Sequence, residues 1–303
     1  MNRYFAASGR DGSLRSARLG ALLAAGVVSL GAFGCGGSSG VQEPLSVGLI
    51  PNQSPDEVQA EYQPLEDYLS EELDREVELE VPTSYNAVVE AMSSGELDLA
   101  YFGGLTYVQA REMANLHPLV TEVNPRTGDT TYRSAIITPA GSDIQDIEDL
   151  RGKDFAFGSV SSTSGSLYPS IMLADAGIDY REDLGETTYT GGHDATAQAV
   201  ANGRVAAGGL EYRILLDLVE EGAIDEDSYR VVEQSEPIEG YPWVVRSDLP
   251  DELEEDVAQA YLDIEDQELL DLLRAEDYER VEASDYDYAE ERARELDLLT
   301  ATE

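Results

Sequence analysis

The stretch "KDFAFGSVSSTSGSLYPSIMLADAG" at residues 153–177 decides the fold. Its first part, "KDFAFG" (153–158), is a short apolar run typical of a buried strand, and "GSLYPSIMLADAG" (165–177) predicts a helix that ends at a glycine. Between them, "SSTSG" (161–165) crowds hydroxyl side chains that cannot pack a core. The order of strand, polar loop and helix therefore places these hydroxyls at a helix N-terminus in an α/β fold.

The rest of the chain repeats this order. Strands are predicted at 45–50, 76–82 and 97–104, and helices begin at Ser54 and Ser84 between them. A second set of elements follows, and its strands are expected at 132–138, 153–158, 204–210, 229–236 and 241–248. We therefore predict two lobes, each a mixed sheet flanked by helices, with a ligand cleft between them. Lobe I would comprise residues 45–133 plus 236–303, and lobe II residues 134–235.

The first residues have the pattern of an export signal. Four arginines precede "LGALLAAGVVSLGAF" (19–33), an apolar stretch of signal-peptide length that is short for a membrane-spanning helix. The chain's only cysteine, Cys35, follows and opens a Gly/Ser-rich segment. A lone cysteine cannot form an internal disulfide. We predict a signal peptide at 1–34 and a lipidated Cys35 with a flexible linker over 35–44, hence an exported protein anchored to the cell envelope by lipid.

The charge balance is strongly acidic. The chain has 19 basic and 62 acidic residues, a formal net charge of −43, and Lys153 is its only lysine. Nucleic-acid recognition needs a basic footprint, so this charge argues against a nucleic-acid partner. Because the acidic residues are spread along the whole mature chain and lysine is nearly absent, we interpret them as an adaptation to concentrated salt, which screens self-repulsion.

The hydroxyl cluster at residues 161–164 has two possible roles, anion binding and helix capping. The first backbone N–H groups of a helix lack partners and its dipole favours an anion, so Ser162, Thr163 and Ser164 could hold one together with those N–H groups. Alternatively, one of these serines caps the helix, which is common. A cap needs a single hydroxyl, whereas this loop has four in a row at residues 161–164.

Four stretches together resemble the phosphate/phosphite/phosphonate-binding proteins of ABC importers, over about residues 45–300. They are "LDLAYFGGLTY", "GKDFAFGSVSSTSGSLYPSIML", "GGHDATAQAVANGRV" and "PIEGYPWVVRSDLP". The resemblance implies a type II periplasmic-binding-protein fold that closes on a phosphorus oxyanion and delivers it to an ABC permease. It implies ligand contacts from the hydroxyl loop (Ser162, Thr163, Ser164), from His193 in "GGHD" and from Tyr85.

Two positions depart from the family pattern. Where aminoalkylphosphonate binders carry acidic residues, this chain has Arg213 and Tyr241, with Glu211 nearby. An arginine there disfavours a cationic ligand tail and could add a bidentate contact to an oxyanion. Whether Arg213 or Glu211 faces the cleft is left open by the sequence. Phe102 replaces an expected tyrosine, and the adjacent Tyr101 is expected to substitute for it.

The sequence also bears on whether the chain is an enzyme, holds a metal or has another binding function. "GGSSG" (36–40) matches a hydrolase pattern but lies in the predicted linker, so we expect no enzyme. With two histidines far apart and one cysteine, no metal site is expected, and no cofactor. The alternatives on the same fold are a sensor that presents its ligand to a membrane receptor or kinase, and a binder of another small anion such as a sulfonate. We expect a monomer.

Overall fold

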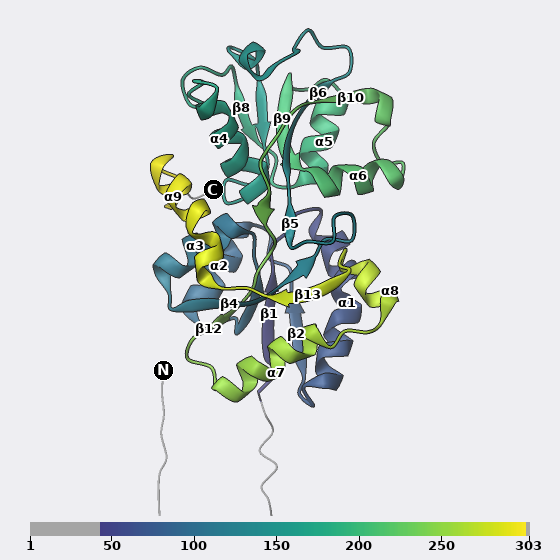
Figure 1. Cartoon of the computed structure of the whole chain (residues 1–303), viewed down its shortest axis with the longest axis vertical. Helices are drawn as coiled ribbons and strands as arrows, with labels where there is room; N and C mark the ends of the chain where they lie inside the picture. The colour runs from purple at the N-terminus through teal and green to yellow at the C-terminus, as the bar shows by residue number, and fades with distance from the viewer. Residues whose placement is uncertain (1–42, 301–303) are drawn as a thin grey trace, which may run out of the picture. The chain divides into compact units, whose positions relative to one another are not determined.

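The computed structural model describes residues 43–300 of the chain. The predicted leader at 1–34, the predicted lipidation site Cys35 and the linker up to residue 42 lie outside the described residues. Within residues 43–300, the strands form two larger sheets and one two-stranded sheet, and helices pack around both larger sheets (Figure 1). No helix between residues 43 and 300 combines the length and the apolar character that crossing a bilayer requires.

The first large sheet has six strands in the order β13-β4-β12-β3-β1-β2. The central strands β1 and β3 are short apolar runs, which suits strands covered by helices on both faces. β1 lies parallel to β2 and β3, whereas β12 and β13 are antiparallel to their neighbours. The strands are β1 (Leu45–Leu49), β2 (Val77–Glu80), β3 (Leu99–Tyr101), β4 (Leu116–Val123), β12 (Trp243–Arg246) and β13 (Asp277–Arg280). We call this sheet and its helices lobe I.

Five helices belong to lobe I. They are α1 (Pro55–Glu72), α2 (Tyr85–Ser94), α3 (Gly104–Met113), α7 (Asp251–Leu262) and α8 (Gln267–Leu272). α2 shows why the chain becomes helical here: the Ser84 side chain accepts a hydrogen bond from the amide of Ala87 at 3.2 Å. The helix ends at Gly95, whose φ of 81° is left-handed and favours glycine. These two signals fix Tyr85 as the first residue of α2.

The second large sheet has five strands in the order β10-β6-β9-β7-β8. β7 is parallel to β8 and β9, and β6 is antiparallel to β9 and β10. We call this sheet and its helices lobe II. Its elements are β6 (Ser134–Pro139), η1 (Ile147–Leu150), β7 (Phe155–Phe157), η2 (Thr163–Leu167), α4 (Tyr168–Asp175), β8 (Thr187–Tyr189), α5 (His193–Ala201), β9 (Ala207–Glu211), α6 (Tyr212–Glu220), η3 (Glu226–Ser228) and β10 (Tyr229–Gln234).

The chain passes between the two large sheets at a small antiparallel pair of strands, β5 (Thr131–Tyr132) and β11 (Ile238–Glu239). Figure 1 shows β5 between the upper and lower groups of elements. After η4 (Ala283–Tyr286), the last helix α9 (Asp287–Glu295) contacts both α3 of lobe I and η2 of lobe II. Two strands and one helix therefore join the lobes.

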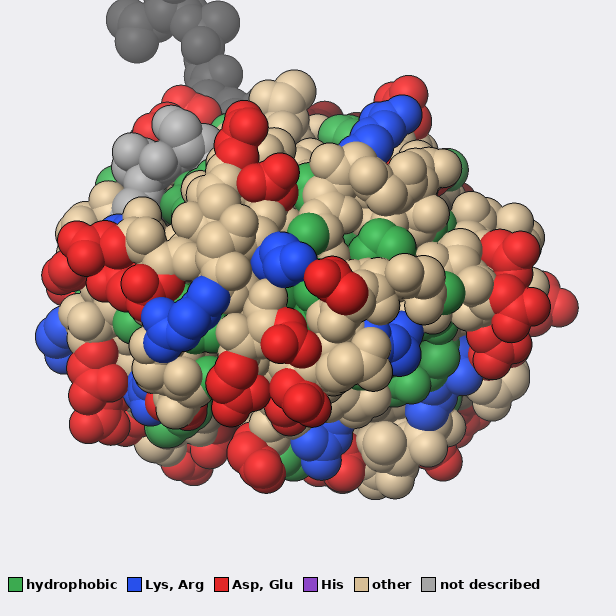
Figure 2. Space-filling view, turned by 90° about the horizontal axis from the view of Figure 1, so that it is seen from above, with side chains coloured by type: hydrophobic (Ala, Val, Ile, Leu, Met, Phe, Trp, Pro, Cys, Tyr) green, Lys and Arg blue, Asp and Glu red, His purple; other side chains and the backbone are tan. Residues whose placement is uncertain are grey.

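The surface carries its acidic side chains in a dispersed pattern. Figure 2 shows one face, on which aspartates and glutamates are scattered between polar groups with a few arginines or lysines among them. On this face, the acidic residues do not gather into a single patch that would mark a docking site for a basic partner. This distribution agrees with the spread of acidic residues along the sequence.

Candidate ligand-binding site

The hydroxyl loop lies between the end of β7 and the start of α4, as its sequence predicts, and residues 161–166 are buried. The loop turns into a single π-helical segment, η2, which α4 continues. The Ser162 Oγ accepts a hydrogen bond from the amide of Gly165 at 3.0 Å. Ser162 is thus the helix cap, and the neighbouring hydroxyls of residues 161, 163 and 164 are left for other partners.

Two of those hydroxyls connect the lobes. The amide of Leu105, at the start of α3, donates to Thr163 Oγ1 at 2.9 Å. The Ser161 Oγ donates to Oδ1 of Asn86 in the first turn of α2 at 2.7 Å. In addition, the Thr106 hydroxyl donates to the Ser161 carbonyl at 3.0 Å. The hydroxyl loop therefore meets the N-termini of two helices of lobe I.

His193 is the first residue of α5 and is only 1% exposed. Its backbone N–H donates to the carbonyl of Asn52 in lobe I at 2.9 Å. Its ring Nδ1 accepts the backbone N–H of Glu211 at 3.2 Å, and its Nε2 is buried without a partner. Burial lowers the pKa of His193, so the ring is neutral at pH 7. The other histidine, His117, lies elsewhere, 3.0 Å from Glu254 Oε2.

Gly165 allows the histidine ring to rest against the hydroxyl loop. A Cβ at this position would lie 3.2 Å from His193 Cε1 and 2.9 Å from Ser162 Oγ. Any larger residue would therefore push the ring away from the loop. Close packing against His193 therefore explains why a glycine stands at the end of the "STSG" sequence, which the sequence by itself only suggested.

Three polar atoms at this place are buried without a hydrogen-bond partner: Ser164 Oγ, His193 Nε2 and the Tyr132 hydroxyl. The His193 ring lies against Gly165, the residue that follows Ser164 in the chain. The phenol of Tyr132 also lies near Ser164, and an interaction between the two hydroxyls that falls outside regular hydrogen-bond geometry opposes the strong rise that burial causes in the pKa of Tyr132. An unsatisfied buried polar group costs about 1–3 kcal/mol. All three atoms can donate to an oxyanion, which would remove that cost.

Arg213 takes part in a buried ionic network beside these atoms. Its Nε donates to Glu211 Oε1 at 2.6 Å, and its Nη2 donates to Glu122 Oε1 at 3.0 Å. The Tyr241 hydroxyl donates to the other oxygen of Glu211. Arg213 and Glu211 are thus both buried and bound to each other, and a ligand contact of Arg213 would have to use the remaining N–H groups of Nη1 and Nη2. The guanidinium also lies 5.0 Å from the centre of the Tyr132 ring.

Burial and the charge of Arg213 shift the pKa values of both carboxylates of this network in opposite directions. Burial is the largest influence on Glu211 and raises its pKa, but the charge of Arg213 and the hydrogen bonds from Tyr241 and Arg213 together bring the pKa below its usual value. For Glu122, burial raises the pKa and Arg213 opposes the rise. Glu122 belongs to lobe I whereas Arg213 and Glu211 belong to lobe II, so the network also joins the lobes.

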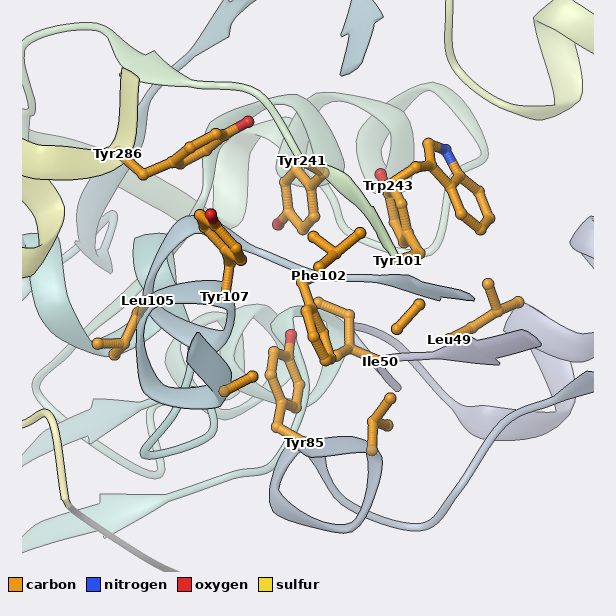
Figure 3. Packing of buried hydrophobic residues seen from close by; sticks show 14 of the residues in the cluster. Leu49, Ile50, Tyr85, Tyr101, Phe102, Leu105, Tyr107, Tyr241, Trp243 and Tyr286 are labelled. Atoms are coloured by element: carbon orange, nitrogen blue, oxygen red, sulfur yellow. The ribbon is translucent and has the colours of Figure 1, made fainter. Parts of the chain in front are cut away.

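Tyr85 and Tyr101 lie on the lobe I side. Tyr85, at the start of α2, precedes Asn86, which binds the hydroxyl loop, and it is 2% exposed. The Tyr101 ring stacks on Tyr241, with ring centres 5.2 Å apart. Figure 3 shows Phe102 near Tyr85, whereas Tyr101 lies with Tyr241 and Trp243. Tyr101 therefore occupies a different part of the wall from Phe102, and its substitution for a tyrosine at 102 stays a prediction.

Residues 47–286 match the profile of the family described as "ABC transporter, phosphonate, periplasmic substrate-binding protein". The chain belongs to this family. The resemblance seen in the sequence is thereby confirmed, and the family is one of exported transport proteins rather than of enzymes.

Curated relatives point the same way. The phosphate-import protein PhnD of Mycolicibacterium smegmatis is 31% identical over 235 residues, 72% of this chain and 73% of the relative. A probable phosphite-binding protein of an ABC transporter, PhnD1 of Prochlorococcus marinus, is 28% identical, with 84% of this chain and 90% of the relative covered. This chain is therefore similar to these substrate-binding proteins over most of its length.

The fold is shared with solved structures. The structure of Prochlorococcus marinus PhnD1 in complex with methylphosphonate matches with a TM-score of 0.74 at 27% identity, covering 84% of this chain and 98% of that one. A phosphonate-transporter binding protein from Pseudomonas aeruginosa also matches, with a TM-score of 0.74 at 22% identity and with 85% of this chain and 95% of that one covered. The predicted α/β fold of periplasmic binding proteins, with mixed sheets and flanking helices, is confirmed.

The sequence had not pointed to every residue at this place. Tyr132 was missed because it lies at the start of a predicted strand and has no motif around it. Glu122 was missed for a similar reason, since "LVTEV" is typical of a strand with one exposed position. In the folded chain Glu122 is 2% exposed and paired with Arg213. Only the approach of the two lobes makes that pair.

Proposed function

We propose that this protein binds a phosphorus oxyanion, namely phosphate, phosphite or a small phosphonate, between its lobes and delivers it to an ABC permease. The observation that carries the proposal is that Ser164, His193 and Tyr132, which lie in or against the hydroxyl loop, each have a buried polar atom without a regular hydrogen bond. Helix N-termini at His193 and at the hydroxyl loop point their partial positive charge to the same place. The relatives named above for phosphate, phosphite and methylphosphonate support the same class of ligand.

In this proposal the ligand is held by Ser162, Thr163, Ser164 and His193 of lobe II and by Tyr85 of lobe I, with Tyr101 and Arg213 shaping the wall around it. The lobes move as units of residues 45–133 plus 236–303 and residues 134–235, about the β5–β11 strand pair. An aminoalkylphosphonate is a poor ligand, because Arg213 already occupies the carboxylates of Glu211 and Glu122 that would attract an ammonium group.

Calorimetry with phosphate, phosphite, methylphosphonate, aminoethylphosphonate and sulfate tests the proposal. We expect at least one of the first three to bind and the last two to bind more weakly. Ser164→Ala should weaken binding, whereas Ser70→Ala should not, because the Ser70 hydroxyl binds Val77 within lobe I, away from the hydroxyl loop. A protein that binds none of the phosphorus oxyanions, or a Ser164→Ala variant that binds like the parent, would contradict the proposal.

We also propose that Cys35 is the lipidated first residue of the mature, monomeric protein. The motif that supports this is the arginine-rich apolar leader followed by the single cysteine and a Gly/Ser segment. Cys35→Ser should move the protein from the membrane fraction to the soluble fraction. Retention of Cys35→Ser in the membrane fraction would contradict the lipid anchor while leaving the ligand proposal untouched.

A further inference from the structure

We propose that the site binds its phosphorus oxyanion as a singly charged anion that keeps one acidic proton, with His193 as a neutral hydrogen-bond donor. The inference rests on the proposed function and adds the charge state of the ligand, which that function leaves open. It follows from the fixed direction of the histidine ring, from the charges around it and from the kind of donors that are available.

The tautomer of His193 is set by the protein. Its Nδ1 accepts the backbone N–H of Glu211 at 3.2 Å, so Nδ1 cannot carry a proton in the neutral ring. The single ring proton is then on Nε2, the atom that is buried without a partner next to the hydroxyl loop. His193 can therefore donate one hydrogen bond to an anion without contributing a positive charge, and burial, which lowers its pKa, keeps it neutral.

The charged groups around this place have no net positive charge. Arg213 of α6 is bound by two carboxylates, Glu211 of β9 and Glu122 of β4. Asp194, the next residue of α5, adds a further carboxylate near the histidine and acts to raise its pKa. Burying a doubly charged anion beside this group would add two negative charges to a surplus that is already negative, which is costly in a medium of low dielectric constant.

Helix N-termini provide the positive potential instead. Each supplies about half of an elementary charge, and three of them, those of α2, α5 and the η2–α4 segment, meet at the hydroxyl loop. The first free amide of α3, at Leu105, is already used by Thr163. Together these partial charges amount to about one and a half elementary charges, so they favour a singly charged ligand over a doubly charged one.

The site can also accept the proton that such a ligand carries. The hydroxyls of Ser164 and Tyr132 are both unpartnered, and a hydroxyl can accept one hydrogen bond while donating another. Burial raises the pKa of Tyr101, Tyr132 and Tyr241 well above the usual value, so these phenols stay protonated. Tyr85 of α2 contributes a further phenol to the same wall. A P–OH group would thus meet an acceptor as well as donors.

The ³¹P chemical shift of bound methylphosphonate and of bound phosphate tests the inference directly. In free solution the shift moves as the ligand loses its second proton between about pH 6 and pH 9. In the complex we expect it to stay at the value of the monoanion throughout that range. The apparent dissociation constant should then rise about tenfold for each pH unit above the second pKa of the ligand, whereas that of hypophosphite, a monoanion throughout, should stay constant.

A shift of the bound ligand at the dianion value would overturn the inference while leaving the proposed function intact. Failure of methylphosphonate, phosphite and phosphate to bind would instead overturn the proposed function. The ¹⁵N shifts of His193 give a second readout, because the chain has only two histidines and His117→Gln removes the other signal. A ring protonated at both nitrogens in the complex would show a cationic histidine and would contradict its role as a neutral donor.

Discussion

Two of the regions where the lobes meet use opposite kinds of polar contact. At the hydroxyl loop, the contacts are buried and involve neutral groups, such as Leu105 N–H with Thr163. Beside Arg213, a crevice of about 540 Å³ at the lobe boundary is lined mostly by charged side chains. There Asp217 of lobe II lies 2.7 Å from Arg126 and 3.0 Å from Arg274, both of lobe I.

This difference indicates which contacts can still contribute to ligand affinity in concentrated salt. The side chains of Arg126, Arg274 and Asp217 are 36%, 26% and 21% exposed, so dissolved ions screen their attraction. Hydrogen bonds between buried neutral groups are not screened in this way. If the net charge of −43 is an adaptation to concentrated salt, as the sequence predicts, the chain is expected to rely on the buried region for binding.

The largest effect is expected from the buried ionic network that accompanies the hydroxyl loop. Arg213→Met leaves Glu122 and Glu211 buried without their cation, so the free energy of unfolding should fall by about 3–5 kcal/mol. Urea titration measures this loss. Arg280→Met is the control, because its pair with Glu255 is exposed and little change is expected. Equal losses in the two variants would contradict the distinction between buried and exposed pairs.

The next effect separates binding from capping within the hydroxyl loop. Ser164→Ala removes a hydroxyl that has no regular hydrogen bond within the protein, so ligand affinity should fall by about 1.5–3 kcal/mol, roughly tenfold or more, while the ligand-free melting temperature stays nearly unchanged. Ser162→Ala removes the cap of η2 and should lower stability by about 1 kcal/mol. Calorimetry and thermal melting measure both quantities. A drop in melting temperature for Ser164→Ala with unchanged affinity would reverse the assignment.

A smaller effect concerns pH. The folded pKa of His193 lies below its unfolded value near 6.5, so the unfolded chain binds the additional proton first. Stability from this residue is complete above that unfolded value and is lost as the pH falls through it toward the folded pKa. His193→Gln should flatten the fall in melting temperature between about pH 7 and pH 5, relative to the parent. An unchanged slope would show that the ring is not held neutral.

The smallest effect is expected in the ionic crevice. Asp217→Asn removes the carboxylate that Arg126 and Arg274 share, and at low salt it should weaken ligand binding by less than about 1 kcal/mol. In molar salt the difference from the parent should vanish, whereas that of Ser164→Ala should persist. A loss of ligand affinity in Asp217→Asn that does not depend on salt would contradict the distinction between the exposed crevice and the buried hydroxyl loop.

The sequence predicted the helices and strands whose signals are local. Ser84 and Gly95 marked both ends of α2, and the hydroxyl loop was placed between a strand and a helix. The last part of the chain was not predicted. The sequence of α9 has almost no apolar pattern, and only its Ala289 and Ala293 are buried. The strand β13 likewise has a single buried residue, Tyr278. These elements are held by neighbours from distant parts of the chain.

The sequence by itself determined the family, the acidic surface and the positions of Ser162, Thr163, Ser164 and His193, because short motifs and composition are properties of the chain alone. Only the tertiary structure decided which hydroxyl caps the helix, that Arg213 is bound by Glu211 and Glu122, and that Tyr132 lies beside Ser164. The physical reason is distance along the chain. Glu122 and Arg213 are 91 positions apart, and no local pattern shows that the approach of two lobes will bury them together.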